Sequence, residues 1–257
     1  RLGQFIQADP LAAGTQPTEL AVEDFNRDGI PDVVVADASG TNVNFFLGST
    51  DRDDPFAGAA CPFNIRKRAS RIVATDLNRD ARPDFAIASE QTNDISVFLR
   101  NSGVTVDCDN ISQAFGALAP ISLSGPPRGL VSRVFDLADA IPDLAVGVAS
   151  QTAAGQARLH LGQASGTASV RYGTGTTLAD GGVPLTGPLT IATGDINRDA
   201  RLDLIVLDSD GGDDVVIYLG LADGSFGQPL VPVSSGPGTA QALEVTDLDG
   251  DARDDII

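Results

Sequence analysis

D24-F-N-R-D-G-I-P-D32 decides the fold, because versions of this stretch return four more times along the chain. The other copies occupy residues 76–84 (D-L-N-R-D-A-R-P-D), 136–143 (D-L-A-D-A-I-P-D), 195–203 (D-I-N-R-D-A-R-L-D) and 247–255 (D-L-D-G-D-A-R-D-D). Their first residues lie 52 to 60 positions apart. A recurrence of this size predicts a repeat architecture rather than one mixed core.

Each copy lies among four short apolar segments that keep the same order. In the first repeat these are L20-A-V-E-D before the loop, then V33-V-V-A, V43-N-F-F-L-G and P62-F-N-I. The segments are too short for helices and rich in Val, Ile and Phe, and Gly and Pro cluster between them. Four antiparallel strands repeated at this spacing predict an all-β fold, a β-propeller of four-stranded antiparallel blades.

The repeats favour a single β-propeller region over residues 1–257, with about five repeats. R1-L-G3 resembles the end of an alternating strand such as Y218-L-G220, and I256-I257 ends inside an apolar strand. The chain is therefore expected to start and end within a blade. Three explanations stay open: trimmed residues, a window from a larger ring or array, or completion by a neighbouring chain through strand addition.

Composition argues against several classes of protein. A net charge of −18 disfavours a nucleic-acid partner, which requires a basic surface. No apolar stretch approaches the roughly 20 residues of a membrane-spanning helix, so we expect no membrane insertion. The chain has no Met and no signal peptide, which fits a processed protein or an excised piece. We expect a secreted protein, extracellular or at the cell surface.

The two cysteines, Cys61 and Cys108, fall in insertions at similar places of adjacent repeats. In an extracellular setting they favour a disulfide, which would contribute about 4 kcal/mol on the chain-entropy model. The alternative is two unrelated free thiols.

The Asp-rich loops offer the ligands of a hard cation. Positions 1, 3, 5 and 9 carry side-chain oxygens, and the carbonyl at position 7 would add a backbone ligand. Calcium accepts six to eight oxygens at flexible angles, so it suits the loop better than magnesium, and zinc is disfavoured without Cys or His. We predict Ca²⁺ at about four sites. The predicted ligands are Asp24, Asn26, Asp28, Ile30 and Asp32; Asp76, Asn78, Asp80, Arg82 and Asp84; Asp195, Asn197, Asp199, Arg201 and Asp203; and Asp247, Asp249, Asp251, Arg253 and Asp255, with Ile30, Arg82, Arg201 and Arg253 acting through their carbonyls.

The third copy is expected to bind poorly or not at all. It is one residue short and has Ala138 in place of the oxygen at position 3, which leaves Asp136, Asp139 and Asp143. An alternative for every copy is that the loops are only Asx-type turns, which Asp and Asn favour.

Position 6 of the loop varies between copies. It is Gly29 in the first and Ala81, Ala200 and Ala252 in three others. Either the backbone there avoids positive φ, or those loops are strained and bind more weakly.

At these residues the chain resembles the FG-GAP/VCBS repeat family, which includes the integrin α-subunit head and many bacterial surface proteins. The matching pieces are D-x-N-x-D-G-x-x-D followed by an apolar strand, the L-G after the alternating strand, and the Phe-Gly of D223-G-S-F-G-Q-P229. The resemblance covers nearly the whole chain and implies a β-propeller, usually of seven blades, with calcium in the loops that join first and second strands. This chain has too few copies for seven blades, and its Phe-Gly is poorly kept in copies 1 to 3.

We expect a non-catalytic, calcium-binding propeller that serves adhesion, surface structure or protein–protein interaction. Its partner would be a protein or a glycan at a cell surface, and the chain could also assemble with copies of itself. The alternatives are a carbohydrate-binding, lectin-like propeller and a structural subunit of a surface filament assembled through its incomplete ends. The ions themselves are expected to be structural rather than to bridge a ligand.

Two further features of the sequence are candidate sites. His160 alternates with Arg158 on a strand, so it is expected to face solvent or a neighbouring blade, and no nucleophile can be named beside it. The basic stretch Arg66–Arg68, with Arg71 after it, is interpreted either as a solvated loop that offsets nearby acid or as a contact with an acidic partner or a neighbouring subunit. Neither feature supports an enzyme.

Overall fold

The computed structural model describes residues 10–257 apart from gaps at 52–53, 57, 137, 151–154, 166–168, 179–184, 186–188, 209–213, 231–232, 235–241 and 252. The expectation for R1-L-G3 therefore lies outside the described residues. None of the described helices is long and apolar enough to cross a membrane.

Four antiparallel sheets follow one another along the chain, and a two-stranded fifth begins after them. Blade 1 consists of β1 (Pro17–Glu23), β2 (Asp32–Asp37), β3 (Asn42–Phe46) and β4 (Cys61–Asn64). Blade 2 consists of β5 (Arg71–Thr75), β6 (Asp84–Ser89), β7 (Asp94–Arg100), the helical turn α1 (Ile111–Ala114), and β8 (Phe115–Ala117) and β9 (Ile121–Ser122), which both pair with β7.

The later blades are built in the same order. Blade 3 consists of β10 (Pro127–Arg133), β11 (Asp143–Val148), β12 (Gln156–His160) and β15 (Thr176–Thr177), with an added hairpin of β13 (Gly162–Ala164) and β14 (Val170–Tyr172). Blade 4 consists of β16 (Leu189–Gly194), β17 (Asp203–Asp208), β18 (Asp214–Tyr218) and β19 (Val233–Ser234), and blade 5 begins with β20 (Val245–Thr246) and β21 (Asp255–Ile256).

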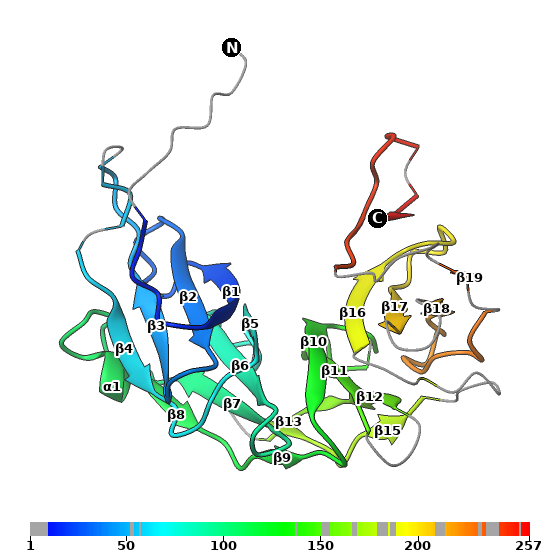
Figure 1. Ribbon diagram of the computed structural model, residues 1–257, viewed down its shortest axis with the longest axis horizontal. Helices are drawn as coiled ribbons and strands as arrows, with labels where there is room; N and C mark the ends of the chain where they lie inside the picture. The colour runs from blue at the N-terminus through cyan, green and yellow to red at the C-terminus, as the bar shows by residue number, and fades with distance from the viewer. Residues whose placement is uncertain are drawn as a thin grey trace.

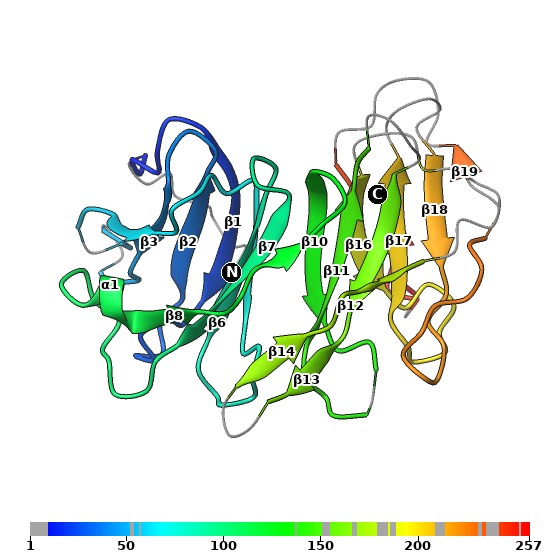
Figure 2. The ribbon, with the colours of Figure 1, turned by 90° about the horizontal axis from the view of Figure 1, so that it is seen from below.

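The blades stand side by side along an arc, with β1 at one end and the β20–β21 hairpin at the other (Figure 1). The first strand of each blade contacts the first strand of the next, in the order β1, β5, β10, β16, β20. Figure 2 shows the same succession of sheets from below. This arrangement confirms the predicted all-β fold of four-stranded antiparallel blades.

The second strand of each blade is the most buried, as its unbroken apolar sequence predicts. Every described residue of β6, β11 and β17 is buried. A strand covered on both faces needs apolar side chains on both, so it shows no alternation.

The cores lie at the junctions between blades. One cluster joins blades 1 and 2 and is rich in phenylalanine, with Phe25, Phe45 and Phe85 fully buried. A second cluster joins blades 2 and 3, and a third joins blades 3 and 4. Each blade is thus stabilised mainly by its neighbours, as expected of a repeat protein.

Cys61 and Cys108 form the predicted disulfide. It links β4 of blade 1 to the segment that precedes α1, with a Cα–Cα distance of 4.8 Å. Cys61 is 1% exposed and belongs to the cluster between blades 1 and 2. The bond therefore fastens two neighbouring blades at their outer edge.

His160 does not face solvent, and that part of the prediction is wrong. Its side chain is fully buried, and its Nδ1 lies 3.0 Å from the carbonyl oxygen of Gly173. Burial lowers the pKa of the imidazole, because the charged form would lose its hydration. The period-two pattern failed here because the turn after β14 covers this position.

An aromatic residue recurs at the outer edge of all four blades. The aromatic position of the Phe-Gly motif is therefore occupied in every one of these blades, although the motif is hard to recognise in the sequence of the first three. Each aromatic pairs with a residue at the end of the third strand or two positions beyond it: Gly48 with Phe56, Arg100 with Phe115, Gly162 with Tyr172, and Gly220 with Phe226. Insertions of different length separate the partners, and sequence spacing alone therefore hid the first three copies.

Candidate metal centre

Each Asp-rich loop joins the first strand of its blade to the second. In loop 1, Asp24 at position 1 accepts the N–H of Asp28 on Oδ1 (3.1 Å) and the N–H of Gly29 on Oδ2 (2.9 Å). Asn26 Oδ1 accepts the Asp28 N–H at 2.9 Å, and Asp28 Oδ1 accepts the N–H of Ile30 at 2.8 Å. Positions 1, 3 and 5 therefore fold back over one turn. Their remaining lone pairs can face a single cation.

Loops 2 and 4 repeat this pattern. Asp76 and Asp195 at position 1 each accept two backbone N–H groups at 2.7 to 3.0 Å. Asn78 and Asn197 at position 3 each accept one, at 3.1 and 3.0 Å. These contacts include Asx-type turns, and turn formation and cation binding use different lone pairs of the same oxygens. The structure thus places positions 1, 3 and 5 of three loops in one hydrogen-bonded turn, and cation binding there stays a prediction.

The backbone at position 6 takes positive φ in all three of these loops. Gly29 has φ 87°, and Ala81 and Ala200 both have φ 63°. The two alanines therefore adopt the left-handed backbone conformation, which is strained for a residue with a Cβ atom. Ala252 of loop 5 lies outside the described residues.

The aspartate at position 9 has a structural role that the sequence did not reveal. Asp32 is fully buried; its Oδ2 accepts the N–H of Asn26 (3.2 Å) and its Oδ1 accepts the N–H of Gly48 (2.7 Å). One carboxylate thus ties the loop to the end of the third strand. The same double contact is made by fully buried Asp84, Asp143 and Asp203.

Burial raises the pKa of these carboxyls because ionised oxygens lose hydration. The pKa of Asp84 is raised to about 7 and that of Asp143 to about 6, chiefly by desolvation and against the opposing effect of the backbone N–H donors. The pKa values of Asp32 and Asp203 are raised by the same cause. Each position-9 carboxylate would therefore gain from a nearby divalent cation.

Position 7 distinguishes loop 1 from loops 2 and 4. The sequence assigns this position a backbone carbonyl ligand, but Arg82 and Arg201 also place a guanidinium on the position-5 carboxylates of Asp80 and Asp199. Loop 1 has Ile30 there and supplies no such cation. A metal ion in loop 2 or loop 4 would have to share the position-5 carboxylate with an arginine or displace that arginine. Loop 1 therefore offers the less obstructed set of oxygens.

The described residues of loop 3, which leave out residue 137, show a different bonding pattern. Asp136 accepts the N–H of Ala138 (3.2 Å) and Asp139 accepts that of Ile141 (2.9 Å), and among these residues neither shows the double contact that position 1 makes in loops 1, 2 and 4. The Gly224 turn of blade 4 covers Asp136 so closely that an added Cβ would overlap it. Weak or absent binding at this loop stays a prediction.

Loop 5 gathers three carboxylates at the end of the arc. One oxygen from each of Asp247, Asp249 and Asp255 lies within 4.8 Å of the others. These are positions 1, 3 and 9 of the loop, and Asp251 at position 5 accepts the N–H of Arg253 at 2.8 Å. The donor set consists of hard oxygens and fits calcium.

Arg100 is a buried cation near loops 1 and 2. It occupies the place that Gly48, Gly162 and Gly220 fill in the other blades. Its side chain is 8% exposed, and its pKa is lowered by burial and by neighbouring Arg27 and Arg82. The sequence feature that marks this position is the absence of a glycine after Leu99, where the third strands of the other blades have Leu-Gly.

The basic stretch is divided between two environments. Arg66 and Arg68 are exposed, whereas Lys67 is half-buried and lies 2.8 Å from both carboxylate oxygens of Asp94 and 2.9 Å from Ser96 Oγ. Lys67 therefore links blade 1 to blade 2. The interpretation as a solvated loop fits only Arg66 and Arg68.

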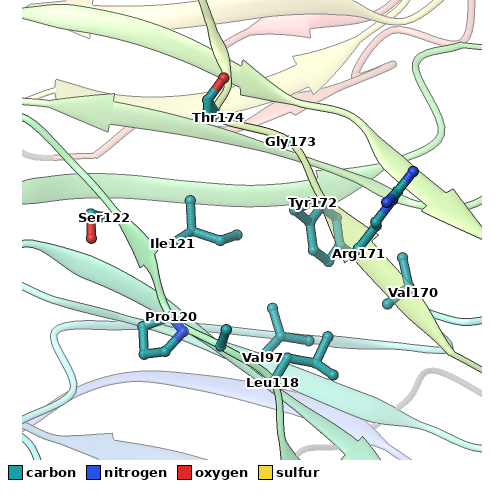
Figure 3. A pocket seen from close by; sticks show the side chains of 11 residues that line it. Val97, Leu118, Pro120, Ile121, Ser122, Val170, Arg171, Tyr172, Gly173 and Thr174 are labelled. Atoms are coloured by element: carbon teal, nitrogen blue, oxygen red, sulfur yellow. The ribbon is translucent and has the colours of Figure 1, made fainter. Parts of the chain in front are cut away.

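An apolar groove of about 390 Å³ lies where the blade 3 hairpin meets blade 2. Figure 3 shows Tyr172 and Ile121 on its walls, with Val97 and Leu118 beneath them. The Tyr172 hydroxyl donates to the carbonyl of Pro142 at 3.1 Å. Tyr172 is thus the edge aromatic of blade 3, and its hydroxyl group stabilises the fold through this hydrogen bond.

Comparison with known proteins gives one family and a set of related structures. A model of the FG-GAP-like repeat matches residues 24–87 and 195–257, which contain loops 1, 2, 4 and 5 and omit loop 3. No curated protein matches the chain.

The chain is also similar to the crystal structure of BBS1N in complex with ARL6DN, soaked with lead. The TM-score is 0.50 at 14% sequence identity, and the match covers 95% of this chain and 60% of that chain. The chain therefore spans less than two thirds of that protein's length. At this identity the likeness shows a shared β-propeller fold.

Proposed function

Because this chain carries FG-GAP-like repeats and folds as a β-propeller, we propose that it is a calcium-binding propeller of the extracellular space or cell surface. It serves adhesion, surface structure or protein–protein interaction and has no catalytic role. Its partner is a protein or a glycan at a cell surface.

The observation that carries this proposal is the repeated loop geometry. Loops 1, 2 and 4 turn the side-chain oxygens of positions 1, 3 and 5 over one tight turn, and loop 5 gathers three carboxylates within 4.8 Å. Calcium would neutralise these loops in a chain of net charge −18 and would hold each first strand to its second. The Cys61–Cys108 disulfide supports an oxidising compartment.

A thermal melt with millimolar calcium and with excess chelator, at constant magnesium, tests the proposal. A ligand that binds only the folded state at a hundredfold excess over its Kd stabilises by about 2.7 kcal/mol per site. Each kcal/mol raises the Tm of a chain this size by about 2–4 °C. We therefore expect a calcium-dependent rise of several degrees at least.

Matched variants assign that rise to the loops. Asp76→Asn removes a position-1 carboxylate and should reduce the calcium-dependent rise, whereas Asp139→Asn in loop 3 should leave it unchanged. The difference in Tm between calcium and chelator is the readout, so a change in basal stability does not confuse the result. Equal Tm values with and without calcium would remove the calcium part of the proposal.

A further inference from the structure

Arg100 carries a buried positive charge that no carboxylate of the described residues neutralises by direct contact. Its Nη2 donates to the carbonyl oxygen of Val104 at 3.3 Å. Its Nε and Nη1 are buried and have no acceptor among the described residues, and none of the ion pairs of these residues includes Arg100. A buried charge without partners destabilises the fold, because it has lost its hydration. The residue therefore requires an explanation other than packing.

The backbone around Arg100 favours glycine. The equivalent residues of the other three described blades are Gly48, Gly162 and Gly220. A Cβ added to any of these glycines would overlap the carbonyl oxygen of the residue that precedes the position-9 aspartate. Blade 2 thus has a long cationic side chain where these blades have no side chain at all. A residue that departs from the rule of its own repeat, at a cost in stability, indicates a function.

Two further guanidinium groups lie near Arg100. Arg82, at position 7 of loop 2, places its Nε 3.4 Å from the Arg100 carbonyl oxygen. Arg27, at position 4 of loop 1, is exposed, and its side chain makes no ion pair among the described residues. The equivalent residue of loop 2, Arg79, reaches the next blade and donates from Nη1 to the carbonyl oxygen of Asp139 at 2.7 Å. Position 4 of loop 1 extends in the same direction, since Arg27 is close enough to Arg100 to repel it.

Repulsion between these cations outweighs the attraction of nearby carboxylates at Arg100. Burial lowers the pKa of Arg100 most, and the lowering effects of Arg27 and Arg82 follow, ahead of the raising effects of Asp80 and Asp24. Asp80 already accepts the Arg82 guanidinium, and Asp24 accepts two backbone N–H groups. An anion bound beside Arg100 would neutralise this excess of positive charge.

We propose that Arg100, Arg27 and Arg82 form a binding site for an oxyanion group, a sulfate, phosphate or carboxylate, on the face of the Asp-rich loops between blades 1 and 2. A guanidinium presents parallel N–H donors that match two oxygens of such a group. Exposed Arg27 meets the ligand at the surface, and a change of side-chain rotamer brings the free donors of Arg100 to it. The inference does not rest on calcium binding or on a place at the cell surface, because the three cations belong to the chain itself.

Isothermal titration calorimetry of the full 257-residue chain tests the proposal, with sodium sulfate, sodium phosphate and sodium acetate as separate probes. The chain is kept free of both metal and chelator, because calcium precipitates phosphate and chelators are themselves carboxylates. Ionic strength is held constant so that screening does not vary. We expect saturable binding of at least one probe at one site. Binding of sulfate or phosphate alone would identify a tetrahedral group as the ligand, and binding of acetate would identify a carboxylate.

Matched variants assign the binding to these residues. Arg100→Gly and Arg27→Gln should each weaken binding about tenfold or more, the loss expected for one charge-assisted hydrogen bond. Arg100→Gly introduces the residue found at this place in three other blades, and Arg27→Gln changes an exposed residue, so both should fold. Arg198→Gln is the control, because Arg198 is position 4 of loop 4, is equally exposed and has φ 62° against 65° for Arg27. It should bind the probe like the unmodified chain.

Three results would overturn the proposal. The first is the absence of saturable binding for all three probes. The second is binding that neither Arg100→Gly nor Arg27→Gln weakens, since the anion would then lie elsewhere. The third is an equal loss in Arg198→Gln, which would show that the net charge of the chain governs binding and not this cluster.

Discussion

At the scale of single residues, the loops combine two kinds of aspartate that look alike in sequence. Asp24, Asp76 and Asp195 hold the turn at the surface by accepting backbone N–H groups. The position-9 residues, such as Asp84, are fully buried and bond both the loop and the third strand. The same side chain therefore holds a surface turn in one place and acts as a buried acceptor in the other, and cation binding at the surface position is the proposed role.

Backbone strain at position 6 predicts that glycine is the better residue there. Ala81→Gly and Ala200→Gly should each stabilise the chain by about 0.5–1 kcal/mol, because left-handed φ costs an L-residue about 1–2 kcal/mol and the gain is partly offset by unfolded-chain entropy. Gly29→Ala is the reciprocal variant and should destabilise the chain, since φ at this position is 87°. An added Cβ would meet nothing within 4 Å, so the loss would come from backbone strain and not from a steric clash. Urea unfolding measures both directions. Stabilisation by Gly29→Ala would contradict the strain argument.

At the scale of elements, the disulfide fastens the outer edge of blade 1 to blade 2 across a sequence separation of 47 residues. Replacing both cysteines with alanine should lower the free energy of unfolding by about 4 kcal/mol on the chain-entropy model. Chemical denaturation of the double variant measures the loss. Reduction of the unmodified chain should reproduce most of it, and no loss in either experiment would show that packing alone holds this edge.

At the scale of the whole molecule, the raised pKa values predict how calcium-free stability depends on pH. Asp84 and Asp143 have pKa values near 7 and 6 in the folded chain, above the usual value of 3.8. The folded state therefore binds more protons than the unfolded state between these values, and stability should rise as pH falls from about 8 to about 6. Buried His160, with its lowered pKa, opposes this trend once pH falls below about 6.5.

Thermal melts of the metal-free chain across this pH range check the sign. Asp84→Asn should flatten the rise whatever its effect on basal stability, because it removes the group that titrates near pH 7. In calcium the trend should reverse, since protonated carboxyls are poor ligands. A metal-free Tm that falls between pH 8 and pH 6 would contradict the assignment.

Local sequence patterns were enough to predict the blade and its order of strands. Strand periodicity and the five Asp-rich loops act over a few neighbouring residues, so they can be read directly, and the loops also gave positions 1, 3 and 5 of the candidate site. The strand segments and the disulfide were predicted in their observed places.

Features that depend on contacts between distant segments became visible only in the folded chain. The edge aromatics Phe115 and Tyr172, buried His160 and the double contact of Asp84 were hidden because their partners lie an insertion or a whole strand away.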